Sequence, residues 1–327
     1  NISNLKKIFV NDKFCFIELP NGSRFKRLLK TYPSIIKEGR FDFVHFQYVL
    51  PLIKLKSSGN STKYINTIHD LLFLDFKEYF PFSYRFSRKW MFYLSARRSD
   101  IILTVSEYSK NQICRRFNIA KRKIYVTPNG VKTSNISNVK IQEKFNISNY
   151  ILFVSRFEPR KNHLGLLKAY ITSELFKKGY HLVFIGNKKS QLENATYRGL
   201  LELIPNDLNK FIHFFEDLTS ADLNAFYAQA DCFVFPSHAE GFGIPPLEAA
   251  ILKTKVICSN RTAMADFKFF KYTFNSYKQF DLDIKLSDAL ADEDYPYELI
   301  KAEVLNRYDW GLIAEKFYTL LKDNHKK

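Results

Sequence analysis

Two glutamates flank a glycine-rich loop in the second half of the sequence, Glu240-Gly241-Phe242-Gly243-Ile244-Pro245-Pro246-Leu247-Glu248. Carboxylates accept hydrogen bonds from hydroxyl groups, so two of them at this spacing can line one pocket for a sugar and a ribose. The glycines let backbone N–H groups approach a ligand closely, and the helix expected after them adds the positive end of its dipole. The loop therefore predicts a cradle for an anion or a sugar. The alternative is a glycine turn with a glutamate that complements the helix dipole.

Two cations follow another apolar segment, in the stretch Ser155-Arg156-Phe157-Glu158-Pro159-Arg160-Lys161-Asn162-His163. Arg156 and Lys161 come just after the strand expected at residues 150–155, at the edge where doubly wound folds bind ligands. Because arginine binds phosphate through forked hydrogen bonds and lysine binds it as a point charge, the pair can neutralise a diphosphate. It can also stabilise a leaving group in place of a metal ion. A solvated basic loop that caps the next helix is the alternative.

His69 is the third candidate, because it follows a strand expected at residues 65–68 and precedes Asp70. The end of a parallel strand lies on the ligand edge of its sheet. A single histidine there is more often a packed or hydrogen-bonded structural residue than a catalytic one. Both roles stay open on this evidence.

The elements that position these residues alternate between short β-rich apolar runs and longer segments with helical period. Strands are expected at residues 41–46, 65–68, 101–105, 124–127, 150–155, 181–185, 211–214, 232–235 and 255–258. Helices are expected at residues 82–97, 107–117, 163–175, 221–228, 246–252 and 310–321. This alternation is typical of parallel βαβ units and predicts an α/β fold.

The length of 327 residues exceeds what a single hydrophobic core usually supports, so two domains are expected. Pro128, Asn129 and Gly130 form a strong turn signal, and the polar stretch 132–148 is interpreted as a connector. We therefore expect one domain at residues 1–132 and a second at residues 133–306.

The formal net charge of +17 lies almost entirely in the first of these domains. Residues 1–132 hold 25 Lys and Arg against 9 Asp and Glu, whereas the remainder holds 25 against 24. This asymmetry predicts an anionic partner for the first domain, either a phospholipid surface or nucleic acid. The basic, aromatic helix at residues 82–97 is the leading candidate for a membrane contact. The alternatives are a helix that packs into the core and a merely basic surface.

Several other classes of protein are disfavoured. No apolar run reaches the roughly 20 residues of a membrane helix, and no secretory signal opens the chain. The first residue is Asn1, so an upstream piece is expected to be missing. The four cysteines lie far apart without metal-ligand spacing, which favours reduced thiols in a cytoplasmic protein. The acidic groups at residues 281–283 and 292–294 are interpreted as exposed turns or helix caps, so no metal site is expected.

Five motifs in order resemble the family 4 retaining glycosyltransferases of GT-B fold, of the type that makes bacterial surface glycans. They are His69-Asp70, Thr104-Val105-Ser106-Glu107-Tyr108-Ser109, Pro128-Asn129-Gly130-Val131, the charged stretch 155–162 and the glycine-rich stretch 240–248. Each motif alone is weak, but five in the family's order are specific. The resemblance implies two Rossmann-like domains with parallel sheets facing across a cleft. It also implies that a last helix, at residues 307–327, crosses back to the first domain.

The resemblance further implies a nucleotide-sugar donor site in the second domain and an acceptor site in the first. Glu240 would bind the donor sugar's hydroxyl groups together with the backbone of the loop that runs from Gly241 through Phe242 and Gly243 to Ile244. Glu248 would bind the ribose.

The same resemblance gives the cations and the histidine their expected roles. Arg156 and Lys161 would hold the diphosphate, and His69 would contact the donor sugar or the acceptor near the reacting carbon. Such enzymes retain the anomeric configuration, by same-face attack, and the nucleotide-sugar is a co-substrate, so no cofactor and no metal is expected.

Residues 68–80 look closest to those of mannosyltransferases, so GDP-mannose is the favoured donor, while glucose, N-acetylglucosamine and rhamnose donors stay open. The expected acceptor is a lipid-linked or polysaccharide glycan, and the expected location is the cytoplasmic face of the inner membrane. A basic nucleic-acid-binding protein and a degenerate transferase subunit are the alternatives. Three departures from the family are a short start before residue 41, Lys253 and Lys255 in place of Gly and Pro, and Asp266 in place of Glu.

Overall fold

The computed structural model describes residues 13–55, 57, 62–132 and 137–325. Its contacts divide the chain into two compact units, residues 1–67 with 91–102 and residues 68–90 with 103–327. This division differs from the domain boundary expected at residue 132, and that boundary stays a prediction. The expected crossing of the last helix back to the first domain also stays a prediction.

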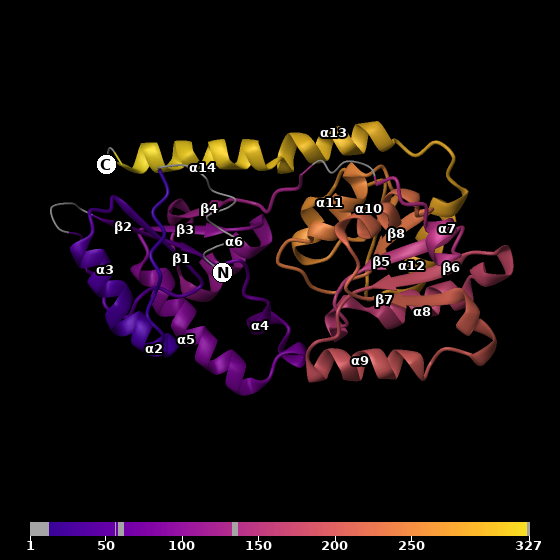
Figure 1. The fold of residues 1–327 in the computed structure, drawn as a ribbon, viewed down its shortest axis with the longest axis horizontal. Coiled ribbons are helices and arrows are strands. Elements are labelled where there is room, and N and C mark those ends of the chain that lie inside the picture. The colour runs from indigo at the N-terminus through magenta and orange to yellow at the C-terminus, as the bar shows by residue number, and fades with distance from the viewer. Residues whose placement is uncertain (1–12, 56, 58–61, 133–136, 326–327) are drawn as a thin grey trace. The chain divides into compact units, whose positions relative to one another are not determined.

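The first four strands form a sheet in sequence order (Figure 1). They are β1 (Phe43–Gln47), β2 (Lys63–Thr67), β3 (Ile101–Thr104) and β4 (Ile124–Val126). β1 and β2 pair in parallel, and every residue of β3 is buried, as expected of a parallel sheet that is covered on both faces. Each strand begins within two residues of the run that predicted it, so these four predictions are confirmed.

The helices of the first half include two that were expected and several that were not. The helical segments are α2 (Arg24–Lys26), η1 (Arg27–Thr31), α3 (Tyr32–Glu38), α4 (Leu72–Asp75), η2 (Lys77–Tyr79), α5 (Phe82–Arg98), α6 (Glu107–Phe117) and η3 (Lys121–Lys123). The prediction of α5 and α6 is confirmed. Ser106 is the N-cap of α6, where its hydroxyl accepts a hydrogen bond from the amide of Ser109.

The second sheet has six strands in the order β10-β9-β8-β5-β6-β7, and all neighbouring strands in it pair in parallel. The strands are β5 (Tyr150–Val154), β6 (His181–Ile185), β7 (Ile212–Phe215), β8 (Cys232–Phe235), β9 (Val256–Ser259) and β10 (Tyr272–Phe274). The chain runs outward from β5 to β7 and then returns to β8 on the other side of β5. This reversal makes the carboxyl ends of β5 and β8 the topological switch point, where open α/β sheets bind ligands.

Helices cover both faces of this sheet (Figure 1). They are α7 (Ile141–Phe145), η4 (Pro159–Lys161), α8 (His163–Thr172), η5 (Leu175–Lys178), α9 (Gln191–Leu201), η6 (Asn206–Phe211), α10 (Ser220–Gln229), α11 (Ile244–Ile251), η7 (Thr262–Asp266), α12 (Gln279–Ala291), α13 (Tyr297–Tyr308) and α14 (Trp310–His325). Because crossovers are right-handed, the reversal after β7 places α8 and α9 on one face and α10 and α11 on the other. α8 packs against α12, and α11 packs against α13.

The core of this half is built on the fully buried aromatic side chains of the central strands, among them Phe153, Phe184, Phe233 and Phe235. The expected connector at residues 132–148 contributes to it, because Ile141 and Ile147 are buried in the same cluster. The connector is therefore partly an element of the second half, while residues 133–136 lie outside the described residues. No helix in the described part of the chain combines the length and the apolar character that a bilayer crossing requires.

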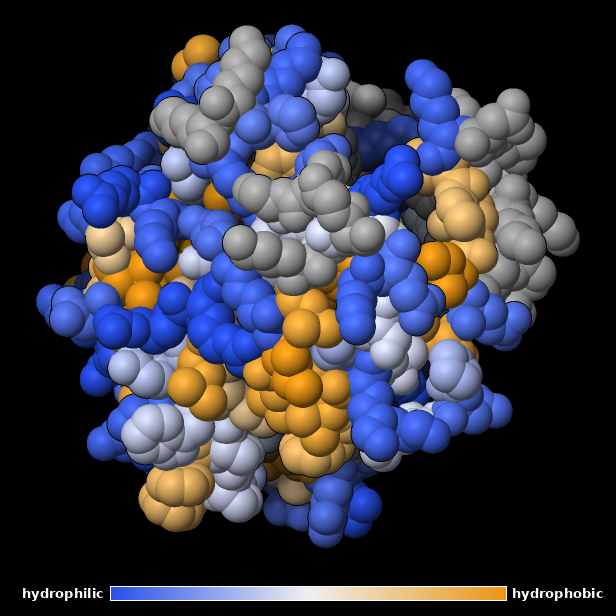
Figure 2. All heavy atoms as spheres, turned by 90° about the vertical axis from the view of Figure 1, so that its left-hand side faces the viewer, coloured by the Kyte–Doolittle hydropathy of each residue, from blue (hydrophilic) through white to orange (hydrophobic). Residues whose placement is uncertain are grey.

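Exposed large apolar side chains are concentrated in α5. Phe82, Phe86, Trp90 and Leu94 are 73%, 57%, 52% and 47% exposed, and their spacing of four residues places them along one side of the helix. Phe92 is buried, so α5 packs through another side. Figure 2 shows one face of the molecule, where hydrophobic side chains gather in patches among hydrophilic ones.

Gly186 provides a test of the packing at the end of β6. A Cβ atom there would come within 1.8 Å of the carbonyl oxygen of Ser155, which belongs to the adjacent strand connection. We expect Gly186→Ala to lower the free energy of unfolding by about 2 kcal/mol or more, because the backbone itself must move.

Gly199, in α9, is the matched control, since nothing lies within 4 Å of its Cβ position. Gly199→Ala should raise the free energy of unfolding by up to about 1 kcal/mol, the helix-propensity difference. Urea denaturation of both variants measures the contrast. Wild-type stability in Gly186→Ala would contradict the close approach.

Candidate functional site

The two charged loops leave adjacent strands and are joined to each other. β5 and β8 pair in parallel, so the loops after them start from the same edge of the sheet. The amide of His238 donates to the carbonyl oxygen of Arg160 at 2.8 Å, and the side-chain amide of Asn162 donates to the carbonyl oxygen of Pro236 at 3.3 Å. Asn162 also caps α8 by accepting from the amide of Gly165. The fold thus brings the two predicted stretches together.

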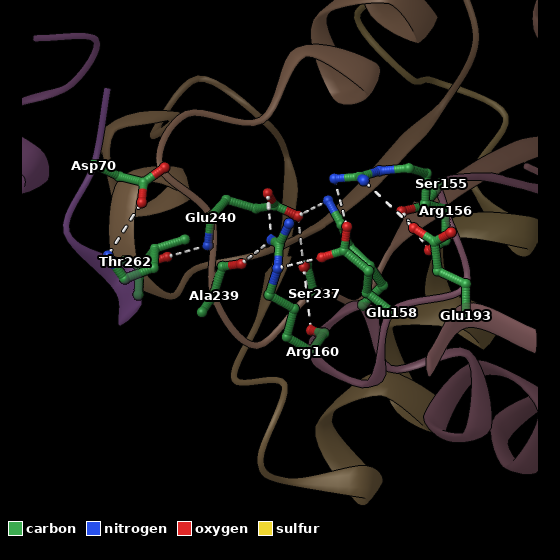
Figure 3. A network of polar contacts seen from close by, with 12 residues as sticks. Asp70, Ser155, Arg156, Glu158, Arg160, Glu193, Ser237, Ala239, Glu240 and Thr262 are labelled. Atoms are coloured by element: carbon green, nitrogen blue, oxygen red, sulfur yellow. Dashed lines mark hydrogen bonds and ion pairs between the residues drawn. The ribbon is translucent and has the colours of Figure 1, made fainter. Parts of the chain in front are cut away.

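Glu240 lies buried at the centre of a polar network (Figure 3). Its Oε1 accepts hydrogen bonds from Lys161 Nζ at 2.5 Å and from the hydroxyl of Ser237 at 2.7 Å. Its Oε2 accepts from Arg160 Nη1 at 2.9 Å. Burial alone would raise the pKa of this carboxyl, but Lys161, Arg160 and the hydrogen bonds together lower it to about 2. Glu240 is therefore an anion at any physiological pH.

Arg160 connects both loops. Its guanidinium donates to the carboxylates of Glu158 and Glu240 and to the carbonyl oxygen of Ala239, at 2.8, 2.9 and 2.7 Å. An arginine can serve three acceptors in this way because it presents five N–H donors in a planar fork. Arg160 is a positioning residue. The sequence analysis gave it no role, although it lies within the charged stretch 155–163.

Lys161 is the more weakly compensated of the two buried cations. Burial lowers the pKa of its ammonium group and Arg160 lowers it further, while Glu240 opposes both effects. The Glu240 carboxylate thus pairs with both Lys161 and Arg160. An additional anion could bind Lys161 while Glu240 kept Arg160 as its partner, so no acidic group would be left unpaired.

Arg156 occupies the exposed end of the same network. Its side chain is 62% exposed and forms ion pairs with Glu158 at 2.5 Å and with Glu193 at 3.3 Å. Glu158 pairs with both Arg156 and Arg160 (Figure 3). Because Glu240 pairs with Arg160 and Lys161, the two predicted cations, Arg156 and Lys161, belong to one network of ion pairs. Glu193 also closes the capping box of α9, which fixes its carboxylate.

Glu248 lies apart from this network. It sits in α11, where its carboxylate accepts a hydrogen bond from the hydroxyl of Tyr227 at 3.1 Å. Burial raises the pKa of Glu248, and the hydrogen bond from Tyr227 partly offsets that rise. Within the described residues it forms no ion pair, so its carboxylate keeps acceptor capacity for a further hydroxyl group.

The loop between the two glutamates has the conformation that its glycines predict. Gly243 has φ of 104°, a region that favours glycine, and it is the residue before α11. Phe242 is buried against the rings of Phe267 and Tyr308, which anchors the loop. In the described part of the chain, the backbone N–H groups of Phe242 and Gly243 meet no acceptor. Together with the start of α11, reached at Ile244, they can receive an anion or hydroxyl oxygens.

The carboxylate of Asp70 approaches the glycine loop. A Cβ on Gly241 would come within 2.5 Å of its Oδ2, so only glycine fits beside it. Ser106 adds a second contact by donating its hydroxyl to the carbonyl oxygen of Gly241 at 2.8 Å. Two motifs of the first half therefore contact the loop, and Asp70 is another residue whose role the sequence did not assign.

His69 is half-buried beside Asp70. Burial lowers the pKa of its imidazole, and the neighbouring carboxylate opposes this effect. The neutral ring is favoured at physiological pH and can accept or donate a hydrogen bond. Its expected contact with a sugar stays a prediction.

The departures at Lys253 and Lys255 are accommodated locally. Lys253 takes a left-handed conformation, with φ of 60°, after α11, which a glycine would adopt more easily. Lys255 is buried, and its ammonium group donates to the carbonyl oxygens of Ala289 and Asp292, both at 2.6 Å. The altered turn therefore keeps the end of α11 in place.

The described residues contain no group of three His, Cys, Asp or Glu side chains that could hold a metal ion. Asp281 lies in the first turn of α12, and Asp292 is paired with Lys271 and Tyr272. The arrangement as a whole offers cations, backbone donors and two separated carboxylates, which together can bind a polyhydroxylated phosphate ester.

Comparison with protein families matches nearly the whole chain. Residues 135–302 match the family described as Glycosyl transferases group 1, and residues 8–135 match the one described as Glycosyltransferase Family 4. The two matches meet within the expected connector.

Two of the relatives are named as O-antigen chain mannosyltransferases. The chain is 30% identical over 217 residues to O-antigen chain mannosyltransferase B of Escherichia coli, covering 62% of this chain and 54% of that protein. It is 29% identical over 196 residues to O-antigen chain mannosyltransferase RfbU of Salmonella typhimurium, covering 59% and 51%. The chain thus spans about half the length of these relatives.

Among solved structures, a glycosyltransferase from Rickettsia africae is similar, with a TM-score of 0.74 at 19% identity over 98% of this chain and 87% of that one. This likeness confirms the predicted GT-B class of two parallel-sheet α/β domains.

The pKa of Glu240 predicts a specific loss of stability in acid. The pKa of this carboxyl group is about 2 in the folded chain, against roughly 4.3 in the unfolded chain. At pH values above the unfolded pKa, its ionised form therefore stabilises the fold. That contribution, on the order of 3 kcal/mol, disappears as the pH falls through about 2. The difference in unfolding free energy between wild type and Glu240→Gln should therefore be largest near neutral pH and shrink in acid.

Denaturant unfolding at several pH values measures this difference. Glu315→Gln, which changes an exposed carboxylate of α14, is the control and should show little pH dependence. A gap between wild type and Glu240→Gln that stays constant with pH would contradict the proposed pairing.

Proposed function

Because the chain belongs to the group 1 glycosyl transferases, we propose that it transfers a hexose from a nucleotide diphosphate sugar to a glycan acceptor. The observation that carries this proposal is the buried Glu240 carboxylate, held by Lys161 and Arg160 at the switch point beside the glycine loop. A diphosphate-sugar needs cations next to hydroxyl acceptors, and this site supplies both.

The proposed chemistry retains the anomeric configuration. The acceptor's hydroxyl oxygen attacks the anomeric carbon from the side on which the bond to the phosphate oxygen breaks. The proton of that hydroxyl passes to the departing phosphate oxygen, and the nucleoside diphosphate leaves. Lys161 and Arg156 stabilise the charge that develops on the diphosphate, which is the main contribution such preorganised cations make to a rate.

The carboxylates divide the recognition of the donor between them. Glu240 binds hydroxyl groups of the sugar next to the N–H groups of Phe242 and Gly243. Glu248, kept apart from the cations, binds the ribose hydroxyls. His69, as a neutral imidazole, contacts the donor sugar or the acceptor hydroxyl near the reacting carbon.

Mannose from GDP-mannose is the favoured donor, supported by residues 68–80 and by the two O-antigen mannosyltransferase relatives. The proposed acceptor is a lipid-linked or polysaccharide chain of a bacterial surface glycan. Those relatives carry the support for this acceptor class, at about 30% identity.

The proposed place of action is the cytoplasmic face of the inner membrane. The exposed stripe of Phe82, Phe86, Trp90 and Leu94 on the basic helix α5 supports a peripheral contact, because aromatic rings and cations together favour anionic interfaces. A chain that stays in the supernatant with anionic vesicles at low ionic strength would contradict this contact.

The donor assignment predicts separate defects for the two ends of the donor. Lys161→Ala should weaken donor binding about tenfold or more, because a charge-assisted contact with the diphosphate is lost. Glu248→Gln should also weaken binding, but it should affect free nucleoside diphosphate and the intact donor equally, since both carry the ribose. Calorimetric titration measures both affinities.

Lys168→Ala, an exposed lysine of α8, is the matched control and should bind as wild type. Wild-type donor affinity in both Lys161→Ala and Glu248→Gln would contradict the site.

A thermal-shift screen identifies the donor. GDP-mannose should raise the melting temperature more than UDP, ADP or dTDP sugars, because a ligand stabilises the state that it binds. Radiolabelled hexose transfer to a membrane extract then tests the activity itself. A larger shift with another nucleotide-sugar would replace mannose, and no shift with any of them would support the degenerate-subunit alternative.

A further inference from the structure

A cavity lined by cations lies outside the proposed donor site. It has a volume of about 770 Å³, and its lining is contributed by α4, η2, the N-terminal half of α5 and the end of α6. Its lining residues are Leu74, Lys77, Phe82, Arg85, Phe86, Lys89, Arg115 and Arg116. No acidic residue is among them, and this size is typical of a small-molecule site.

The positive charge of this cavity is poorly compensated. Asp75 pairs with Arg116, and Arg115 donates to the neutral side chain of Gln112 at 3.0 Å. Within the described residues, neither Arg85 nor Lys89 forms an ion pair, and the Nε atom of Arg85 is buried without a hydrogen-bond partner. A buried donor of this kind costs free energy unless a ligand satisfies it.

Apolar surface adjoins the cations. Phe82 and Phe86 line the cavity and stack on each other with ring centroids 6.1 Å apart, yet both rings are more than half exposed. Arg85 and Lys89 lie three and seven residues after Phe82, on the same side of α5. The site therefore presents a cationic pocket and an apolar wall together.

We propose that this cavity binds the phosphate headgroup of a lipid, with Arg85, Lys89 and Arg115 on the phosphate and with Phe82 and Phe86 against the apolar tail. Arginine forks match phosphate oxygens, and the aromatic wall distinguishes an amphiphile from a free phosphate. This inference goes beyond the proposed membrane contact, because a surface of diffuse charge needs neither a cavity nor a buried donor.

Vesicle sedimentation tests the proposal with two anionic lipids. Phosphatidylcholine vesicles carry either phosphatidic acid, which exposes a phosphomonoester, or phosphatidylserine, which does not, at matched surface charge. We expect roughly tenfold stronger binding to the phosphatidic acid vesicles, because forked contacts to a terminal phosphate add to the general attraction. The triple variant Arg85→Gln, Lys89→Gln and Arg115→Gln should lose this preference.

The matched control removes the same charge elsewhere, with Lys168→Gln, Lys178→Gln and Lys278→Gln at exposed positions. It should keep the preference for phosphatidic acid. Phe82→Ser with Phe86→Ser should weaken vesicle binding but leave the affinity for inorganic pyrophosphate unchanged, which separates the tail from the headgroup.

Four results would overturn the inference. Equal binding to both lipids would mean that the cavity attracts lipids only through its general positive charge. An equal loss of vesicle binding in the pocket and control variants would mean the same. Both results would leave the proposed membrane contact unaffected. Binding of pyrophosphate without any preference for phosphatidic acid would make the occupant a free phosphate. Absence of vesicle binding altogether would remove both this inference and the peripheral contact, whereas the donor site would be unaffected.

Discussion

The proposed donor site depends on one buried carboxylate. Taking the charge of Glu240 out of water costs several kcal/mol, and only direct pairing with cations makes its burial tolerable. Lys161 and Arg160 provide that pairing, and Glu158 balances the remaining charge of Arg160. Removal of Glu240 would leave Lys161 buried without an anionic partner among the described residues. The ion pairs of the site therefore fix its own arrangement, so a ligand need not organise it.

This network ties the site to the topology of the sheet. Arg160 and Lys161 follow β5, while Ser237 and Glu240 follow β8, and these strands are neighbours only because the chain reverses direction after β7. The backbone hydrogen bond from His238 to Arg160 then sets the distance between the two loops. A change in strand order would separate the cations from the carboxylate, so the fold and the ion pairs stabilise each other.

The sequence predicted the class of fold and the two loops, because strand-length apolar runs and glycine turns are local signals. It did not predict the roles of Arg160 and Glu158, since four charged residues within six positions give no indication of which side chains turn inward. That choice is made by the η4 turn and the left-handed Asn162. The sequence also could not predict that Glu248 is separated from Glu240, because Tyr227, the hydrogen-bond partner of Glu248, lies on another helix. The sequence analysis did not predict α9, α12 or α13, and in α9 this was so although its apolar residues follow a helical period.

The two halves of the sequence use positive charge in different ways. Beyond residue 132 cations and acidic residues are almost equal in number, and the cations of the donor site are paired with carboxylates. Such pairing moderates the attraction for a diphosphate, which a transferase must release after each cycle. Residues 1–132 hold a large excess of cations, and of the cations that line the cavity beside α5 only Arg116 forms an ion pair within the described residues. Uncompensated charge of this kind attracts anionic partners in a salt-dependent way. The proposed membrane attachment and the proposed donor binding are compatible because the described residues of the two sites have no charged residue in common.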